Sequence, residues 1–233
     1  MSRIKRILRF FSVFALTLNC SNNKAQKQNT INFLELEEKK STENFLPVLN
    51  SSFIEKIEQK YAGEEYKQYP NVYSDLIEKL CNDVYDKMDK NENHSEFLRQ
   101  LTKEQRVLFT LVNFEAQVNN GGVYQFLFNY PELSIIALES MEEAKMAKLA
   151  ADYRKVLEEF FGKFKTMQEL NNKFQDQSSN WEKRWNSFVD GYKELKSTEI
   201  IESYFYNEDF VKQFQNDMIN YIKANKLKLY KIK

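Results

Sequence analysis

The polar residues that could do chemistry in this 233-residue chain gather around two adjacent glycines near its middle. The group comprises Glu115, Asn119, Asn120, Gly121, Gly122, Gln125 and Asn129. Exposed glycine N–H groups at the start of a helix can hold an anion or a carboxyl-bearing ligand, because the helix dipole and the unbonded N–H groups both favour negative charge there. The pattern therefore indicates a candidate ligand site at the junction of two helices.

The same residues also have a structural interpretation. Glu115 and Gln125 could satisfy the loose backbone groups where two helices meet, since buried polar groups have to be paired. Bulky aromatic residues flank the glycines, and such rings fill a core rather than line a phosphate site. The structural interpretation is therefore preferred, and a ligand-binding or hydrolytic site at the glycine pair is kept as an alternative.

Other catalytic machinery is not indicated. The chain has one histidine, His94, and no HExxH, CxxC or P-loop motif, so neither a histidine-based metal cluster nor a nucleotide site is expected. The neighbouring acids Glu142 and Glu143 do not share a helix face, because facing positions are three or four residues apart. We predict a protein that is not an enzyme and that takes no metal and no cofactor.

The elements that must position these residues are predicted to be helices. Apolar residues recur every three or four positions, and 5 Gly and 3 Pro are too few for a turn-rich β fold. Thr102 and Gln105 fit a capping box, which predicts the start of the helix that carries the glycine pair. A glycine in the left-handed conformation is expected to end that helix, and Pro131 to begin the next but one. The predicted fold class is all-α, a single multi-helix bundle-like domain.

Two further side chains have defined expectations within these helices. Glu115 lies on an apolar stripe, three residues after Val112 and three before Val118, so it is expected to point inward or to be half-solvated at the helix boundary. Cys81 lies on the apolar face of an earlier helix and is expected to be a buried small hydrophobe rather than a nucleophile or ligand.

The start of the chain predicts export. A basic stretch precedes an apolar run at residues 10–18, which is too short to span a bilayer stably and is typical of a secretory signal. Cys20 follows this run, and the arrangement resembles a bacterial lipoprotein signal, in which that cysteine becomes the lipidated N-terminus. Asn19 and Thr17 depart from the usual residues, so an ordinary export signal is the alternative. We expect a membrane-anchored lipoprotein of the cell envelope, with a secreted or periplasmic protein as the alternative.

Composition divides the chain into five predicted segments. They are a signal (residues 1–20), a flexible tether (21–50), a short helical extension (51–69), the main helical domain (70–226) and a basic tail (227–233). The full chain has 34 basic and 34 acidic residues, whereas a general nucleic-acid binder would be strongly basic. Direct binding to nucleic acid is therefore not expected.

A longer pattern around the glycine pair resembles a known family, the DMP-type bacterial DNA-mimic proteins. The family marker is a Glu, then Val-x-Asn-Gly-Gly, an aromatic residue, and x-Gln-Phe-x-x-Asn. It is matched by Glu115, Val118, Asn120, Gly121, Gly122, Gln125, Phe126 and Asn129, whereas Val123 stands where an aromatic residue is usual. The resemblance covers about residues 70–226 and implies an all-helical domain.

The resemblance also raises the hypothesis of DNA mimicry, in which surface charge like that of duplex DNA sequesters a DNA-binding protein. Such a mimic must present phosphate-like charge to a basic groove. Even the most acidic stretch here, residues 73–160, has 10 basic residues beside 16 acidic ones. We therefore expect a non-enzymatic, envelope-tethered module that binds another protein. DNA mimicry is kept as an alternative, and the resemblance leaves a homodimer open.

Overall fold

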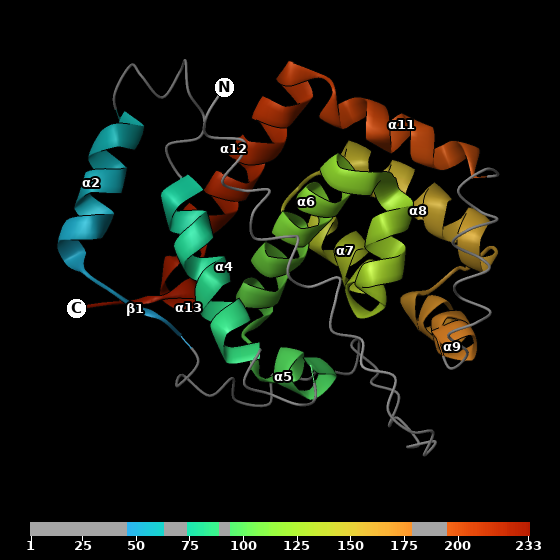
Figure 1. The fold of residues 1–233 in the computed structure, drawn as a ribbon, viewed down its shortest axis with the longest axis horizontal. Coiled ribbons are helices and arrows are strands. Elements are labelled where there is room, and N and C mark those ends of the chain that lie inside the picture. The colour runs from blue at the N-terminus through green and yellow to red at the C-terminus, as the bar shows by residue number, and fades with distance from the viewer. Residues whose placement is uncertain (1–45, 63–73, 89–93, 179–194) are drawn as a thin grey trace. The chain divides into compact units, whose positions relative to one another are not determined.

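The computed structural model describes residues 46–62, 74–88, 94–178 and 195–233, and these ranges are mostly helical (Figure 1). The helices are α2 (Ser51–Ala62), α4 (Ser74–Met88), α5 (His94–Gln100), α6 (Lys103–Asn129), α7 (Pro131–Glu143), α8 (Ala147–Phe161), α9 (Met167–Ser178), α11 (Lys196–Phe205), α12 (Glu208–Ala224) and α13 (Lys226–Leu229). Two short strands, β1 (Val48–Leu49) and β2 (Lys231–Ile232), form one small sheet. The predicted all-α class is confirmed.

Some expectations fall outside the described ranges. These are the signal with Cys20, residues 21–45 of the predicted tether and residues 63–69 of the predicted helical extension. Among the helices that are described, none combines the length and the apolar character that crossing a membrane requires.

Helix α6 is the central element, and it contacts α4, α7, α11, α12 and α13. It begins with the predicted capping box: the Thr102 hydroxyl accepts a bond from the Gln105 N–H at 3.0 Å, and the Gln105 side chain accepts one from the Thr102 N–H at 3.0 Å. Pro131 occupies the first turn of α7, as predicted. Local sequence signals therefore set both ends of the segment that carries the glycine pair.

The core around α6 is aromatic. The Phe114 ring meets those of Phe126 and Tyr153 edge-on, with centroids 5.1 and 5.2 Å apart. A second, smaller cluster lies between β1, α2, α4, the end of α12 and α13, and it includes the buried free thiol of Cys81. Burial raises the pKa of Cys81 to about 12, so this thiol stays protonated and packs as a hydrophobe, as expected.

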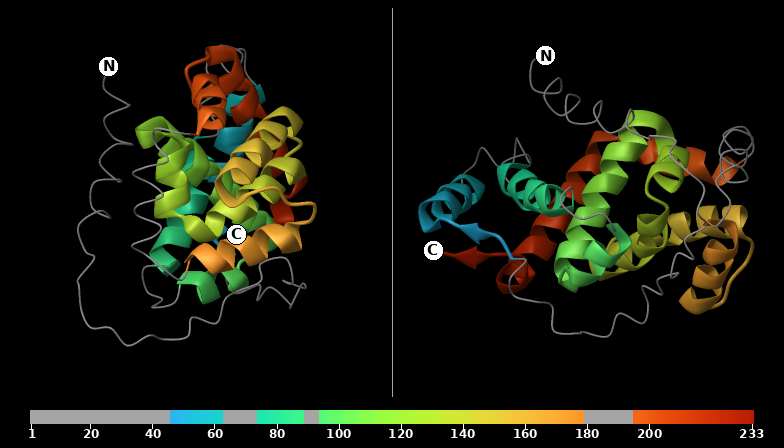
Figure 2. Two further views of the ribbon diagram at one scale, coloured as in Figure 1. Left: turned by 90° about the vertical axis from the view of Figure 1, so that its right-hand side faces the viewer. Right: turned by 60° about the horizontal axis from the view of Figure 1, so that its bottom comes forward.

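The two ends of the described chain meet, which corrects the predicted tether and tail. β1 pairs in parallel with β2: the Lys231 N–H donates to the Pro47 carbonyl and the Lys233 N–H to the Leu49 carbonyl, both at 2.9 Å (Figure 2). Residues 46–50 were predicted as tether and residues 227–233 as a basic tail, yet both segments are ordered parts of the fold. Strands of two residues are too short to show the alternating pattern by which strands are predicted.

Candidate functional site: the glycine junction

The glycine pair divides α6 into two helical halves. The backbone is non-helical at Gly121 (φ −160°, ψ 24°) and at Gly122 (φ 79°, ψ 179°). Only Gly122 therefore has a φ that other residues avoid. A break was predicted here, but the predicted left-handed cap is corrected, since the ψ of Gly122 is extended. The chain turns back at this point, which brings Phe126 of the second half against Phe114 of the first.

A carboxylate from α11 caps the second half of α6. The Val123 N–H donates to the Glu202 carboxylate at 3.1 Å. Negative charge is favourable at a helix start, where N–H groups have no partner within the helix. Glu202 therefore fills the role that the structural interpretation gave to Glu115 and Gln125. The place that an anionic ligand would take at this helix start is held by the protein's own side chain.

A buried amide, Gln117, joins the two halves of α6. Its side-chain oxygen accepts bonds from the amide groups of Gln125 and Asn129, each at 2.8 Å. A methyl group on Gly121 would lie only 1.7 Å from the Gln125 side-chain oxygen. Gly121 is therefore needed to make room for the Gln125 side chain. Gln117 was not among the predicted site residues, although it lies four residues before Gly121 and thus on the same helix face.

The polar face of α6 continues one turn further toward its start. Asn113, which is fully buried, accepts a bond from the Tyr85 hydroxyl at 2.5 Å and donates its amide to the Phe109 carbonyl at 2.8 Å. Tyr85 in turn shares a hydrogen bond with Tyr130, the residue that follows α6. Desolvation by burial raises the pKa of Tyr85, so its hydroxyl stays neutral and able to donate. These paired groups therefore bind α4 and both halves of α6 together.

The remaining predicted site residues lie apart from this network. Asn119 and Asn120 are exposed to solvent. Glu115 is half-buried and shares a hydrogen bond with Gln215 of α12. Desolvation raises the pKa of Glu115 to about 7, and the bond from Gln215 opposes that rise. The structure thus brings Gly121, Gly122, Gln125 and Asn129 together and leaves the other three predicted residues outside.

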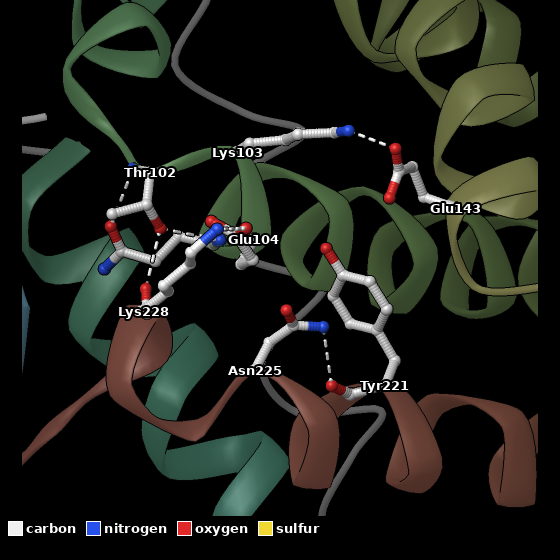
Figure 3. Close-up of polar contacts among 8 residues, drawn as sticks. Thr102, Lys103, Glu104, Glu143, Tyr221, Asn225 and Lys228 are labelled. Atoms are coloured by element: carbon white, nitrogen blue, oxygen red, sulfur yellow. Dashed lines mark hydrogen bonds and ion pairs between the residues drawn. The ribbon is translucent and has the colours of Figure 1, made fainter. Parts of the chain in front are cut away.

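A second polar cluster surrounds the start of α6 (Figure 3). The Thr102 hydroxyl donates to the Lys228 carbonyl at 2.8 Å, and the Lys228 ammonium binds the Glu104 carboxylate at 2.8 Å. Lys103 forms an ion pair with Glu143 of α7. These contacts fasten α13 and α7 to α6, so this cluster also serves the fold. In the described ranges, no group of three or more His, Cys, Asp or Glu residues is arranged to hold a metal ion.

The fold and the junction together define an all-helical domain whose central helix turns back at a glycine pair and is fastened by buried amides. Residues 99–225 match the family described as DMP19-like protein. The chain belongs to this family, which confirms the resemblance seen in the sequence. The match begins after α4, later than the expected start near residue 70. No curated protein and no solved structure matched the chain.

The fastening role of the amides is testable at Gln117. Gln117→Met keeps the length of the side chain but removes the oxygen that accepts from Gln125 and Asn129. We expect a loss of about 1–2 kcal/mol in the free energy of unfolding, because both donors lie near solvent and recover part of their bonding with water. Urea denaturation measures this loss. Gln59→Met, the same change at an exposed glutamine on α2, is the control. Equal stability of the two variants would contradict the role of Gln117.

Proposed function

We propose that this protein is a non-enzymatic helical module that is tethered to the cell envelope and binds another protein. The junction supports the non-enzymatic part, because its polar groups are used internally. The Glu202 carboxylate accepts a hydrogen bond from the Val123 N–H, and the Gln117 side-chain oxygen accepts hydrogen bonds from the side-chain amides of Gln125 and Asn129. A ligand would have to break these bonds before it could use the same groups.

The proposal of protein binding is supported by the exposed outer face of α11 and the two residues that follow this helix. This face consists of residues spaced as neighbours on one side of a helix, all of them exposed: Lys196, Glu199, Ile200, Ser203, Tyr206 and Asn207. Tyr206 is 90% exposed and Ile200 44%. Tyrosine is enriched at protein interfaces, because it buries a large apolar area and keeps a polar tip. The opposite face of α11 already packs on the core through Ile201 and Phe205.

The charge of this region indicates the chemistry of the partner. Glu199, Glu208 and Asp209 are exposed at or beside the outer face of α11. Complementary charge steers association and suppresses wrong partners. We therefore infer that the partner presents basic residues around an apolar contact.

The proposed partner site is tested by affinity capture from detergent-solubilised envelope extracts. Ile200→Ser and Tyr206→Ser together are expected to lower the capture of a specific partner by about tenfold, since aromatic residues near the centre of an interface contribute strongly to binding. Leu227→Ser is the matched control, because it removes another exposed apolar side chain, which lies on α13 beyond the other end of α12. Equal capture by the two variants, or no specific partner at any salt concentration, would contradict the proposal.

The tether is supported by the sequence, in which Cys20 follows an apolar run at residues 10–18. Mass spectrometry of the membrane fraction is expected to find a diacyl or triacyl group on Cys20. Cys20→Ser is expected to release the protein from that fraction. A chain that lacks an acyl group on Cys20 and is recovered outside the membrane fraction would exclude the lipoprotein form and leave a secreted or periplasmic protein.

Family membership supports DNA mimicry as a second candidate. Against it, several acids are paired with lysines of the same chain: Glu143 with Lys103, Glu104 with Lys228, and Glu58 with Lys226. Such pairs do not present a row of free negative charges. DNA mimicry predicts that the chain competes with DNA for a basic partner and that added salt weakens the competition.

A further inference from the structure

We propose that the ribbon end of the domain, formed by residues 47–49 and 226–233, is a lipid-facing surface that rests on an anionic bilayer. This inference rests on the envelope tether proposed above. It adds a second membrane contact, made by the folded domain itself, and it fixes which end of the domain faces the membrane.

The ribbon end exposes apolar side chains beside well-packed ones. Val48 is 59% exposed, Ile232 56% and Leu227 89%, and these are three of the five large apolar side chains that are most exposed in the described ranges. Their neighbours Leu229 and Tyr230 are buried and hold the segment on the core. The exposed residues are therefore displayed by a fixed part of the fold. Val48 lies on the face of the ribbon that carries Lys231 and Ile232 lies on the other face, so the ribbon exposes apolar side chains on both faces.

The charge of the ribbon end complements anionic headgroups. The ribbon end contains four lysines, Lys226, Lys228, Lys231 and Lys233, and no acidic residue. Lys226 and Lys228 each bind one carboxylate from elsewhere in the fold, Glu58 and Glu104. Lysines close to an anionic surface each strengthen binding by about fivefold. A basic and apolar surface of this kind suits lipid headgroups with acyl chains beneath them.

The tether is long enough for this surface to reach the membrane. Cys20 and Val48 are separated by 27 residues, so β1 can never lie more than about 95 Å from the anchor even in a fully extended chain. β2 and Lys233 are held beside β1, where the Lys233 carbonyl accepts a bond from the Ser51 N–H at 3.1 Å. One acyl anchor combined with a basic patch binds far more firmly than either alone.

Helix α12 separates this surface from the proposed partner site. In Figure 1, α11 lies at one end of α12 and α13 at the other. Tyr206 precedes α12 in the sequence, and Leu227 follows it. The 17 residues of α12 span about 25 Å at the usual helical rise. Contact through the ribbon end would therefore keep the outer face of α11 clear of the lipid and open to a partner.

The test uses the full chain, purified from bacterial membranes and reconstituted in vesicles. Leu227→Cys and Tyr206→Cys each carry an environment-sensitive dye, and the parent chain supplies the background from the buried Cys81, because the sulfur of the lipidated Cys20 carries the acyl anchor. In vesicles that contain phosphatidylglycerol, we expect a quencher on the acyl chains to quench the dye at position 227 and to leave the dye at position 206 bright. The quenching is expected to fade at high salt and in phosphatidylcholine vesicles.

Charge reversal makes the test specific. The double variant Lys231→Glu and Lys233→Glu is expected to weaken the contact at position 227 by about tenfold or more. The double variant Lys163→Glu and Lys165→Glu, at exposed positions between α8 and α9, is the matched control and is expected to change nothing. The strand bonds are made by the backbone, and circular dichroism checks that the charge-reversed chain keeps its fold.

The two proposals fail in different ways. If the chain floats with the vesicles but the dye at position 227 is not quenched, or both dyes are quenched equally, the lipid-facing surface is wrong and the tether stands. If the chain does not float with the vesicles at all, the tether is wrong and the inference falls with it.

Discussion

Replacing Gly122 with alanine is expected to destabilise the domain by about 3 kcal/mol. Its backbone (φ 79°, ψ 179°) is one that residues with a Cβ rarely adopt. The new methyl group would also lie 2.3 Å from the Glu202 carboxylate oxygen. That carboxylate would have to move and release the N–H of Val123. Thermal unfolding is expected to fall by roughly 6–12 °C for a domain of this size.

Gly162→Ala is the matched control for this prediction. Gly162 ends α8 with a similar backbone (φ 81°, ψ 159°), but a methyl group there would only approach the flexible Lys173 ammonium at 3.3 Å. The control therefore carries the backbone strain without the collision, and its cost is expected to be about 1–2 kcal/mol. The difference between the two variants measures the contact with Glu202. If Gly122→Ala were no more harmful than Gly162→Ala, Glu202 would not be a stabilising cap.

Features set by neighbouring residues could be predicted from the sequence. The capping box at Thr102, the first turn at Pro131 and the end of α8 at Gly162 all depend on residues within one turn of the helix. The apolar stripe that buries Cys81 is also local. These signals were enough for the all-α class and for the break at the glycine pair.

Features set by distant residues could not be predicted. Glu202 lies 79 residues from the N–H that it caps, and no local pattern marks a carboxylate as the cap of a different helix. Gln117 is an uncharged polar residue that fits equally well on a surface, and only the return of the second half of α6 buries it. Helices α5 and α9 were missed because α5 is short and α9 is mostly polar. Neither carries a long apolar period.

The fold gives the family pattern a physical meaning. Gly122 permits the turn, Gly121 makes room for Gln125, and Asn129 shares the acceptor on Gln117. The hydrogen bonds of Gln125 and Asn129 are internal to α6, so this part of the pattern describes how one long segment turns back on itself. Phe126 packs on Tyr153 of α8, and Glu115 shares a hydrogen bond with Gln215 of α12, so these two pattern residues join α6 to other helices. The contribution of Glu115 to stability is best isolated by following the free energy of unfolding as the pH changes.

Stability is expected to fall as the pH rises from 5 to 8, and Glu115 is expected to be a main cause. Desolvation raises the pKa of this carboxyl from its ordinary value of 4.5 to about 7 in the folded protein. Between these two values the folded state binds more protons than the unfolded state, so each rise in pH favours unfolding. One pKa unit corresponds to about 1.4 kcal/mol, so the upper limit is about 3 kcal/mol, and the residual exposure of Glu115 reduces it to about 1–3 kcal/mol.

Glu115→Gln tests this directly, because the amide has the same shape and no charge. The variant is expected to match the wild type near pH 5 and to exceed its free energy of unfolding near pH 8, as measured by urea denaturation at several pH values. Other carboxyls contribute too: burial also raises the pKa of Asp217 and Glu139, whereas bonds from Lys155 and Tyr204 lower that of Asp152. Asp217→Asn is therefore the control, with a smaller expected change. A Glu115→Gln variant that kept the full pH dependence would show that the Glu115 carboxylate is already ionised and well solvated in the folded protein, and a charged group would then be available beside the glycine junction.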